Sequence, residues 1–273
     1  MRRHLAVACD LFLFQDFDTM TIEAAPCRKS MMRGCLLGLG LALMTSMAVA
    51  EENASNPLAA ANNVDLRWKY TSAEAGDTHD VFIDGAYMVL QRLKLKYELH
   101  YNFTDVTGID EQDFEKLVLK PIYFPSDTKL NENWGLRTAV GFDWIIEFGN
   151  EDKGIGVGAD QIAPLVGLAF SNSGSGLALI PLVQHFISYN GATDVNQTSA
   201  RLIALQPFGA GYWAKLDAKI PYDWENEIWP ASAEFQLGYN LGPSWAAYAE
   251  GLVGVGADRP YDAGAGVGLR FKF

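Results

Sequence analysis

The sequence predicts an all-β protein, a transmembrane antiparallel β-barrel of about twelve strands with short periplasmic turns and longer external loops. Three observations lead to this fold. Apolar and polar residues alternate along many segments, aromatic residues gather near the ends of these segments, and the last segment runs to the final residue. The 273 residues are 49% hydrophobic and include 26 glycines, but they lack the long apolar runs of a helical membrane protein.

The last thirteen residues, 261–273, show the alternation most clearly. One register is apolar from Tyr261 to Phe273, and the other holds Arg270, Lys272 and three glycines. Since neighbouring side chains of a strand point to opposite faces, this strand has two unlike environments. An open edge inside a bilayer leaves backbone groups unpaired, so we expect the last strand to pair with the first.

The same alternation recurs along the chain, for example in 93–103, where Leu93 to Phe103 form one face and Lys94 to Asn102 the other. Twelve such segments are expected: 63–71, 78–90, 93–103, 113–124, 133–148, 161–171, 176–189, 198–208, 212–222, 230–240, 244–255 and 261–273. The segments 113–124, 161–171, 176–189 and 198–208 alternate less cleanly, and Pro121, Pro164, Pro181 and Pro207 predict bulges or weak pairing there.

The connections also alternate, between mostly short turns and generally longer, acidic loops. This layout is typical of an outer-membrane barrel with both ends of the mature chain in the periplasm. A soluble periplasmic sandwich is the alternative. Aromatic residues near both ends of the strands favour the barrel, and so do the glycines 264, 266 and 268, which share a face with charges as in a crowded lumen.

The N-terminal residues carry the features of a secretory signal peptide at 31–50. Arg33 supplies the positive region, an apolar stretch follows, and Ala48 and Ala50 form an A-x-A cleavage site. We expect translation to start at Met31 or Met32, with a long leader as the alternative. All three cysteines precede residue 50, so the exported chain is expected to have no disulfide and no thiolate site.

The expected organisation follows from these boundaries. Residues 1–30 are a non-structural upstream extension, 31–50 the signal peptide, 51–62 a polar periplasmic lead-in, and 63–273 the barrel. The predicted location is the outer membrane of a Gram-negative bacterium, with outer-membrane lipids and lipopolysaccharide as surroundings. The formal net charge of −12 argues against a nucleic-acid partner.

The charged register is expected to face the lumen. Its candidate lining residues are Arg67, Lys69, Asp84, Lys94, Lys96, Glu98, Lys116, Lys120, Arg137, Asp143, Glu147, Arg201, Lys215, Asp217, Lys219, Glu234, Glu250 and Arg270. Unpaired charges in a confined lumen are costly, so we expect cross-strand pairs. The charges either line a polar channel and set its selectivity, or interlock and plug a small barrel.

The residues give little support for enzymatic activity or for a bound metal or cofactor. The surplus acid lies in the expected external loops, where it can attract cations. A lipid hydrolase needs a histidine and a serine on one face, but His185 and Ser188 have the wrong spacing unless a bulge intervenes. No metal-binding motif and no cofactor motif is present, so neither a metal nor a cofactor is expected.

Two resemblances add to this reading. Val267, Leu269, Phe271 and Phe273 resemble the C-terminal signal that the barrel-assembly machinery reads in bacterial outer-membrane proteins. The chain also resembles a little-characterised family of proteobacterial outer-membrane proteins, labelled transporters or grouped with proteins of meta-pathway phenol degradation, and sometimes misnamed neuromedin U. The segments that carry this resemblance are LKLKYELHYNFTDVTG, DKGIGVGADQIAPLVGLA, LIPLVQHFISYNG, TSARLIALQP and WAKLDAKIPYDWEN.

The resemblance implies an outer-membrane barrel that passes small organic molecules, and it supplies no catalytic residues. The function expected from residues and resemblance together is passive transport of small polar or amphipathic solutes, aromatic ones included. Two alternatives stay open. One is a closed structural or adhesive barrel, and the other is a lipid-acting hydrolase that uses His185 and Ser188.

Overall fold

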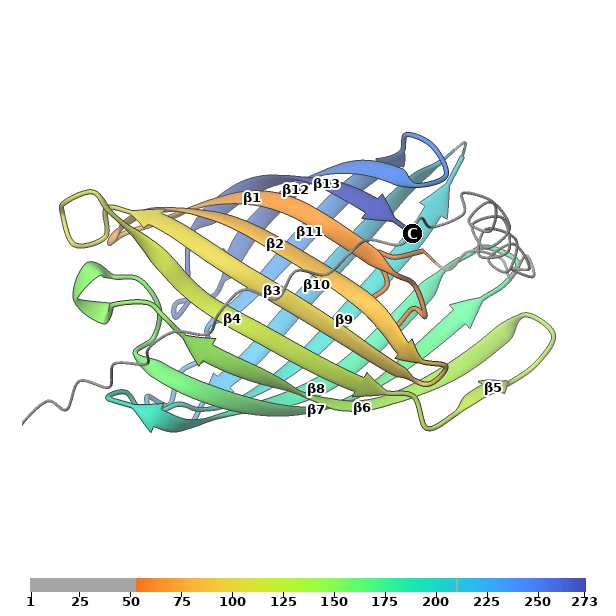
Figure 1. The fold of residues 1–273 in the computed structure, drawn as a ribbon, viewed down its shortest axis with the longest axis horizontal. Coiled ribbons are helices and arrows are strands. Elements are labelled where there is room, and N and C mark those ends of the chain that lie inside the picture. The colour runs from red at the N-terminus through yellow and green to blue at the C-terminus, as the bar shows by residue number, and fades with distance from the viewer. Residues whose placement is uncertain (1–52, 210) are drawn as a thin grey trace, which may run out of the picture. The chain divides into compact units, whose positions relative to one another are not determined.

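The computed structural model describes residues 53–209 and 211–273. The expected upstream extension, the signal peptide and its cleavage residues Ala48 and Ala50 lie outside the described residues. The described part forms one antiparallel sheet of thirteen strands, which curls into a barrel (Figure 1). The strands are β1 (Asn63–Ala73), β2 (Gly76–Leu90), β3 (Leu93–Thr104), β4 (Glu111–Tyr123), β5 (Asp127–Lys129), β6 (Trp134–Glu147), β7 (Ala159–Asn172), β8 (Ala178–Gly191), β9 (Asn196–Phe208), β10 (Tyr212–Asp223), β11 (Ala231–Asn240), β12 (Trp245–Val255) and β13 (Ala263–Lys272).

Twelve of these strands make the closed wall of the described barrel, which confirms the expected fold class. The first and last strands pair from Asn63↔Lys272 to Ser72↔Ala263, as the need to remove sheet edges predicted. β4 pairs with β6, and the three-residue β5 only extends the end of β6. Among the described residues, no helix is long and apolar enough to cross a membrane.

The two ends of the barrel differ. At the short-turn end, where β1 begins and β13 ends, 91–92, 173–177 and 241–244 join neighbouring strands. At the long-loop end the connections include 148–158, which contains a 3-10 turn (η1, Glu151–Lys153), and 256–262. The β1–β2 connection is shorter than expected, because both strands run on to a two-residue turn.

The two faces of the wall also differ, in the way the alternation predicted. Val267 on β13 is 52% exposed on the outer face, whereas Arg270 is 8% exposed and points inward. Large apolar side chains from most strands of the wall are exposed in the same way, including Leu66, Ile83 and Phe235. An apolar outer surface around a closed barrel is what the hydrocarbon core of a bilayer requires.

The glycines of the inward register leave room for large neighbours. A Cβ atom on Gly238 would lie 2.1 Å from the buried ring of Trp213 on β10. A Cβ atom on Gly268 would lie 2.2 Å from the ring of Tyr248 on β12. The interior is therefore crowded at these points, which agrees with the interpretation of the glycines that share a face with charges.

The predicted irregularities occur at three of the four prolines. Cross-strand partners are missing at Pro121 in the β4–β6 pair and at Pro164 and Pro181 in the β7–β8 pair, whereas Pro207 keeps its partner on β10. A further bulge, in the β3–β4 pair, lies opposite His100 and was not foreseen.

Candidate functional site

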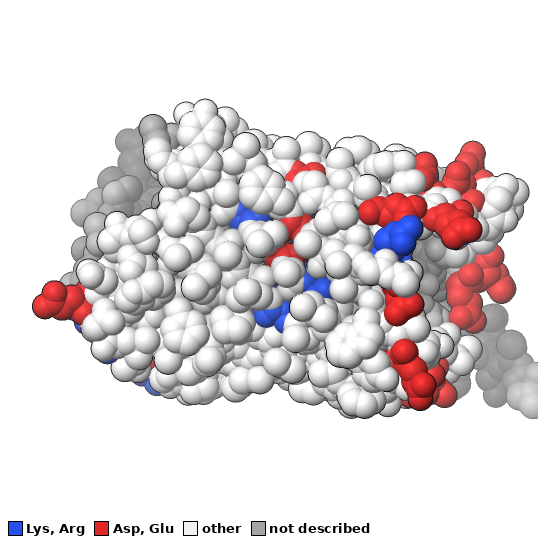
Figure 2. Space-filling model, turned by 180° about the vertical axis from the view of Figure 1, so that it is seen from behind, with Lys and Arg blue, Asp and Glu red and all other residues white. Residues whose placement is uncertain are grey.

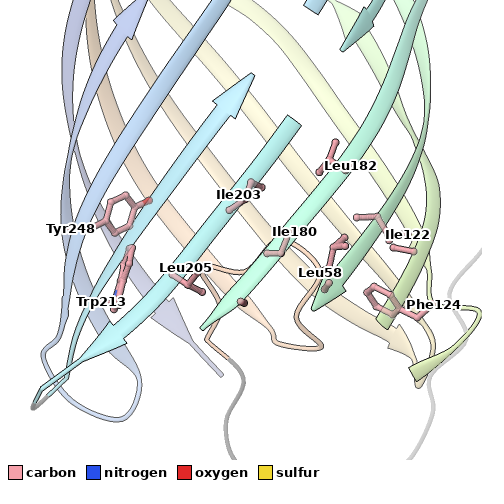
Figure 3. Close-up of a cluster of buried hydrophobic side chains, with 12 residues drawn as sticks. Leu58, Ile122, Phe124, Ile180, Leu182, Ile203, Leu205, Trp213 and Tyr248 are labelled. Carbon is pink, nitrogen blue, oxygen red and sulfur yellow. The ribbon is translucent and has the colours of Figure 1, made fainter. Parts of the chain in front are cut away.

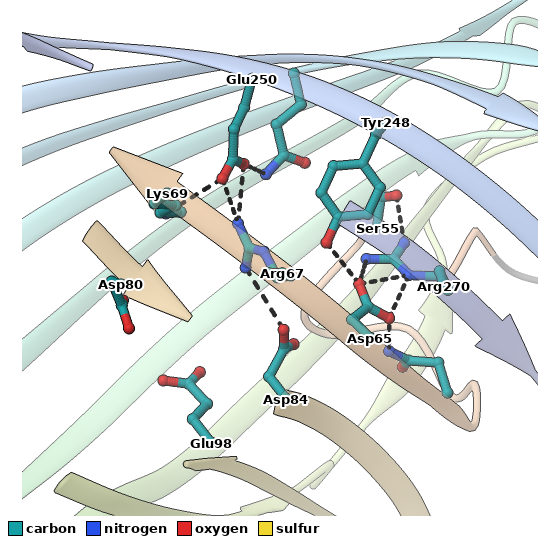
Figure 4. A network of polar contacts seen from close by, with 12 residues as sticks. Ser55, Asp65, Arg67, Lys69, Asp80, Asp84, Glu98, Tyr248, Glu250 and Arg270 are labelled. Carbon is teal, nitrogen blue, oxygen red and sulfur yellow. Dashed lines mark hydrogen bonds and ion pairs between the residues drawn. The ribbon is translucent and has the colours of Figure 1, made fainter. Parts of the chain in front are cut away.

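The candidate site is the interior of the barrel, where ion pairs join strands that are far apart in sequence. Arg67 on β1 donates to Glu250 on β12 at 2.9 Å and lies 3.7 Å from Asp84 on β2. Arg67 is paired with Gly268 on the intervening strand β13, and Glu250 with Gly266. Because these glycines carry no side chain, the arginine and the glutamate meet over β13 (Figure 4).

The same group of charges continues toward β10. Lys69 lies 3.2 Å from Glu234 on β11 and 3.7 Å from Glu250. Lys219 on β10 contacts the other oxygen of Glu234 at 2.9 Å. Glu234 and Glu250 thus each contact two cations, an arrangement that compensates the cost of removing these charges from water.

A second group lies nearer the short-turn end. Arg270 donates from Nε and Nη2 to Asp65, with the shortest contact at 2.6 Å, and from Nη1 to Ser55. Tyr248 donates to the same aspartate at 2.8 Å (Figure 4), and Asn63 donates to it at 2.7 Å. Asp65 is completely buried, so its charge is stabilised by these four donors alone among the described residues.

A third group occupies the side formed by β2, β3, β4 and β6. Lys120 bridges Glu98 at 3.1 Å and Asp143 at 2.9 Å. Glu98 also lies 3.5 Å from the Nε2 atom of His100, and Lys116 contacts Glu115 at 2.5 Å. The bulge in β4 turns both members of this last pair inward, away from the strict alternation.

A fourth, smaller group joins β9 and β10. Arg201 makes a bidentate contact with the completely buried carboxylate of Asp217, and Lys215 lies 3.9 Å from it. The other predicted residues are placed separately. Lys96 shares the inward register of β3, and Glu147 lies at the end of β6 against the 148–158 loop, with Oε1 buried and without a hydrogen-bond partner in the described part.

Residues 53–62, hereafter the N-terminal segment, fill the short-turn end of the barrel. Leu58 is 2% exposed and lies in an apolar cluster inside the wall (Figure 3). Lys94 on β3 donates to the carbonyl oxygens of Pro57 and Ala59 at 3.2 and 2.8 Å, and Arg137 on β6 donates to that of Leu58 at 3.1 Å. The other cluster members are Ile122, Phe124, Ala139, Ala169, Ala178, Ile180, Leu182, Ile203, Leu205, Trp213 and Tyr248.

These contacts extend across the lumen. The N-terminal segment reaches β3 and β6 through Lys94 and Arg137, and it reaches β13 through the bond between Ser55 and Arg270. β13 and β6 are separated by six strands along the sheet, so one short segment contacts opposite sides of the barrel. It is held there by hydrogen bonds to its backbone carbonyls, by the bond between Ser55 and Arg270 and by buried residues such as Leu58 and Ala59, rather than by strand pairing.

The long-loop end carries the acidic surface that the sequence predicted (Figure 2). Asp77, Asp105, Asp110 and Glu111 line a hollow of about 700 Å³ there, together with His79 and Lys153.

Side-chain contacts join the 148–158 loop to neighbouring elements at this end of the barrel. Lys153 on the 148–158 loop contacts Asp113 at 2.9 Å, and the hydrogen bond and charge of this aspartate raise the pKa of the lysine. Thr193 donates to Glu151 on the same loop at 3.2 Å.

The pair required by the hydrolase alternative does not form. His185 contacts the hydroxyl group of Thr198 at 2.9 Å, and Ser188 accepts a hydrogen bond from the backbone of Val195. β8 pairs regularly with β9 from His185 to Ile187, so side chains three residues apart point to opposite faces, and the irregularity of the β7–β8 pair falls at Tyr189, after Ser188 rather than between the two residues. The described residues therefore give no support to a His185–Ser188 catalytic pair.

Sequence reasoning missed several interior residues. Trp213 and Tyr248 share registers with Lys215 and Glu250, so strict alternation along β10 and β12 would have found them. Glu115 was hidden by the bulge. Nothing periodic marks the N-terminal segment as an interior element.

Comparison with known proteins shows the fold. No family model matches the sequence, and no curated protein matches it. An outer membrane channel from Pseudomonas putida F1 superposes with a TM-score of 0.57 at 10% identity, covering 84% of this chain and 100% of its own. The KdgM porin gives 0.52 at 11% identity over 77% of this chain and 99% of its own, and the NanC porin 0.52 at 13% over 77% and 98%. The chain therefore has the fold of a porin-like outer-membrane barrel.

Proposed function

We propose that this protein is a bacterial outer-membrane channel for passive entry of small polar or amphipathic solutes, aromatic ones included. The observation that carries the proposal is the contrast between an apolar outer wall and an interior whose cations remain partly accessible to water. The side chains of Lys219 and Arg201 are 35% and 28% exposed although they point inward. Water-accessible charges inside an apolar barrel provide a polar route through the bilayer.

The resemblance of several strand segments to outer-membrane proteins grouped with phenol degradation supports the aromatic part of this proposal. The lumen-lining residues would orient a solute through the alternating cations and carboxylates described above. In this proposal the long-loop end faces the exterior, and its acidic loops lie beside lipopolysaccharide bridged by cations.

The N-terminal segment favours a second candidate, a closed barrel with a structural role. It occupies the short-turn end, so a solute that enters from the long-loop end meets Leu58 and its cluster before it can leave. In the channel proposal the segment must move aside for transport. In the closed-barrel proposal it is a permanent plug.

Solute flux separates these two candidates. The outer-membrane form of the protein is reconstituted into liposomes, and swelling is followed with neutral sugars, amino acids and aromatic acids of graded size. The channel proposal predicts flux that falls with solute size. Absence of flux from protein that shows the heat-modifiable migration of a folded barrel would refute the channel and support the plug.

We further propose that residues 31–50 direct export and are removed after Ala50, and that Val267, Leu269, Phe271 and Phe273 are read by the barrel-assembly machinery. Val267, Leu269 and Phe271 are exposed on the outer face of β13 and Phe273 is exposed directly after it, where another protein could contact them during assembly. Mass spectrometry of the membrane-inserted protein tests the first proposal, which requires an N-terminus at Glu51.

A further inference from the structure

Three side chains with metal-ligating atoms meet inside the barrel on adjacent strands. Asp80 on β2, His100 on β3 and Glu115 on β4 each offer one ligand atom, and these atoms all lie within 4.8 Å of one another. Because the three residues stand on hydrogen-bonded neighbouring strands, their backbone positions are fixed by the wall. His100 and Glu115 belong to the third group of interior charges described above, and no sequence motif marks the three residues as a metal site.

The imidazole ring of His100 is held in one orientation. Its face stacks on Phe82, with ring centroids 4.5 Å apart and an angle of 16° between the planes. Nδ1 lies 2.9 and 3.1 Å from the two carboxylate oxygens of Asp80. The histidine is only 7% exposed, so the wall and the stacked phenylalanine restrict its movement.

One polar atom beside the group, the amide oxygen of Asn102, lacks a hydrogen-bond partner among the described residues, and this residue is only 8% exposed. Nε2 of His100 faces the carboxylate of Glu98 at 3.5 Å. The amide nitrogen of Asn102 donates to Glu115 at 3.1 Å, which places the amide oxygen next to this carboxylate. A buried acceptor without a donor is costly, and a bound cation would satisfy it.

The surrounding charges also leave room for a cation. The carboxylates of this part of the barrel, those of Asp80, Glu98, Glu115 and Asp143, exceed the ammonium groups of Lys96, Lys116 and Lys120 by one. Protonation of His100 supplies one positive charge. A divalent cation beside neutral His100 supplies two.

We propose that Asp80, His100 and Glu115 bind a divalent transition-metal ion of the zinc class, with the amide oxygen of Asn102 as a further ligand. Imidazole favours zinc, copper or nickel over calcium and magnesium, which prefer sites made only of oxygen. Tetrahedral zinc with bonds of about 2.0 Å separates its ligand atoms by about 3.3 Å. The His100–Asp80 distances are already near this value, and side-chain rotation of Glu115 closes the rest.

Metal binding by the folded protein tests this proposal. The full-length outer-membrane form is dialysed in detergent against micromolar zinc, and bound metal is counted by mass spectrometry. We expect one zinc ion per barrel and weaker or no retention of calcium. Titration with Co²⁺ should give the visible absorption of a histidine-bound ion. The variants His100→Gln and Asp80→Asn should each lower zinc affinity at least about tenfold.

The matched controls are His79→Gln and His185→Gln, which remove the other two histidines of the described part. Both should retain one zinc ion with unchanged affinity. Migration on gels before and after heating shows which variants fold, and Asp80→Asn keeps the experiment decisive if His100→Gln does not fold. Absence of stoichiometric zinc from the folded wild type would overturn the proposal, as would equal zinc affinity in the wild type and in folded variants of Asp80 or His100. Neither result bears on solute flux, so this proposal and the channel proposal fail separately.

Discussion

The substitution Leu58→Asp tests whether the N-terminal segment is the barrier to transport. Leu58 is 2% exposed in the apolar cluster, and burial of a leucine side chain contributes about 1.5–3 kcal/mol. A carboxylate in the same place loses this contribution and adds a desolvation cost if it stays. Since 1.4 kcal/mol corresponds to a factor of ten, the ratio of undocked to docked segment should rise at least about 10- to 100-fold.

The barrel wall should remain intact, because the segment contributes no strand to it. Liposome swelling should therefore become at least about tenfold faster for solutes that the wild type passes slowly. Ala60→Asp is the matched control, since Ala60 is exposed in the same segment and the substitution introduces the same charge. Equal flux through folded Leu58→Asp, Ala60→Asp and wild-type barrels would refute the idea that the segment limits transport.

Three further substitutions test the fold. Gly238→Ala puts a methyl group 2.1 Å from the buried tryptophan ring of β10 and should destabilise the barrel by about 1–3 kcal/mol in urea unfolding. Gly251→Ala is the control and should leave the stability unchanged, because no atom lies within 4 Å of the added methyl group. Equal stabilities of the two variants would contradict a crowded interior. Asp65→Ala leaves the buried Arg270 without its carboxylate partner and should lower the free energy of unfolding by about 3–5 kcal/mol. An unchanged free energy in the same urea measurement would show that this ion pair does not stabilise the barrel. Phe273→Ala should lower the amount of folded barrel in the outer membrane, and normal levels would remove the assembly role of the C-terminal strand.

Much of the fold could be read from the sequence because strand alternation is local. Each residue of 261–273 points inward or outward according to its own register, whatever its partners are. Closure of the sheet into a barrel then follows, because inside a bilayer the outer edges of β1 and β13 can satisfy their backbone groups only by pairing with each other. The same reasoning places Arg67 and Glu250 inside, but it does not bring them together.

The tertiary structure alone decided which interior residues meet. Arg67 contacts a carboxylate 183 positions away, and this depends on barrel closure and on the glycines of the strand between them. The bulge that turns Glu115 inward breaks the period of two on which the sequence argument rests.

The N-terminal segment is the clearest case of a feature that the sequence does not reveal. Its residues have no strand period, and a polar composition fits a free lead-in as well as a docked one. Its position depends on Lys94 and Arg137, whose side chains face its carbonyl groups only after the wall has closed. Sequence alone determined the wall of this protein and the face on which each strand residue lies, because alternation is a property of one strand. What fills the barrel was decided by contacts across the lumen, because those contacts exist only in the closed structure.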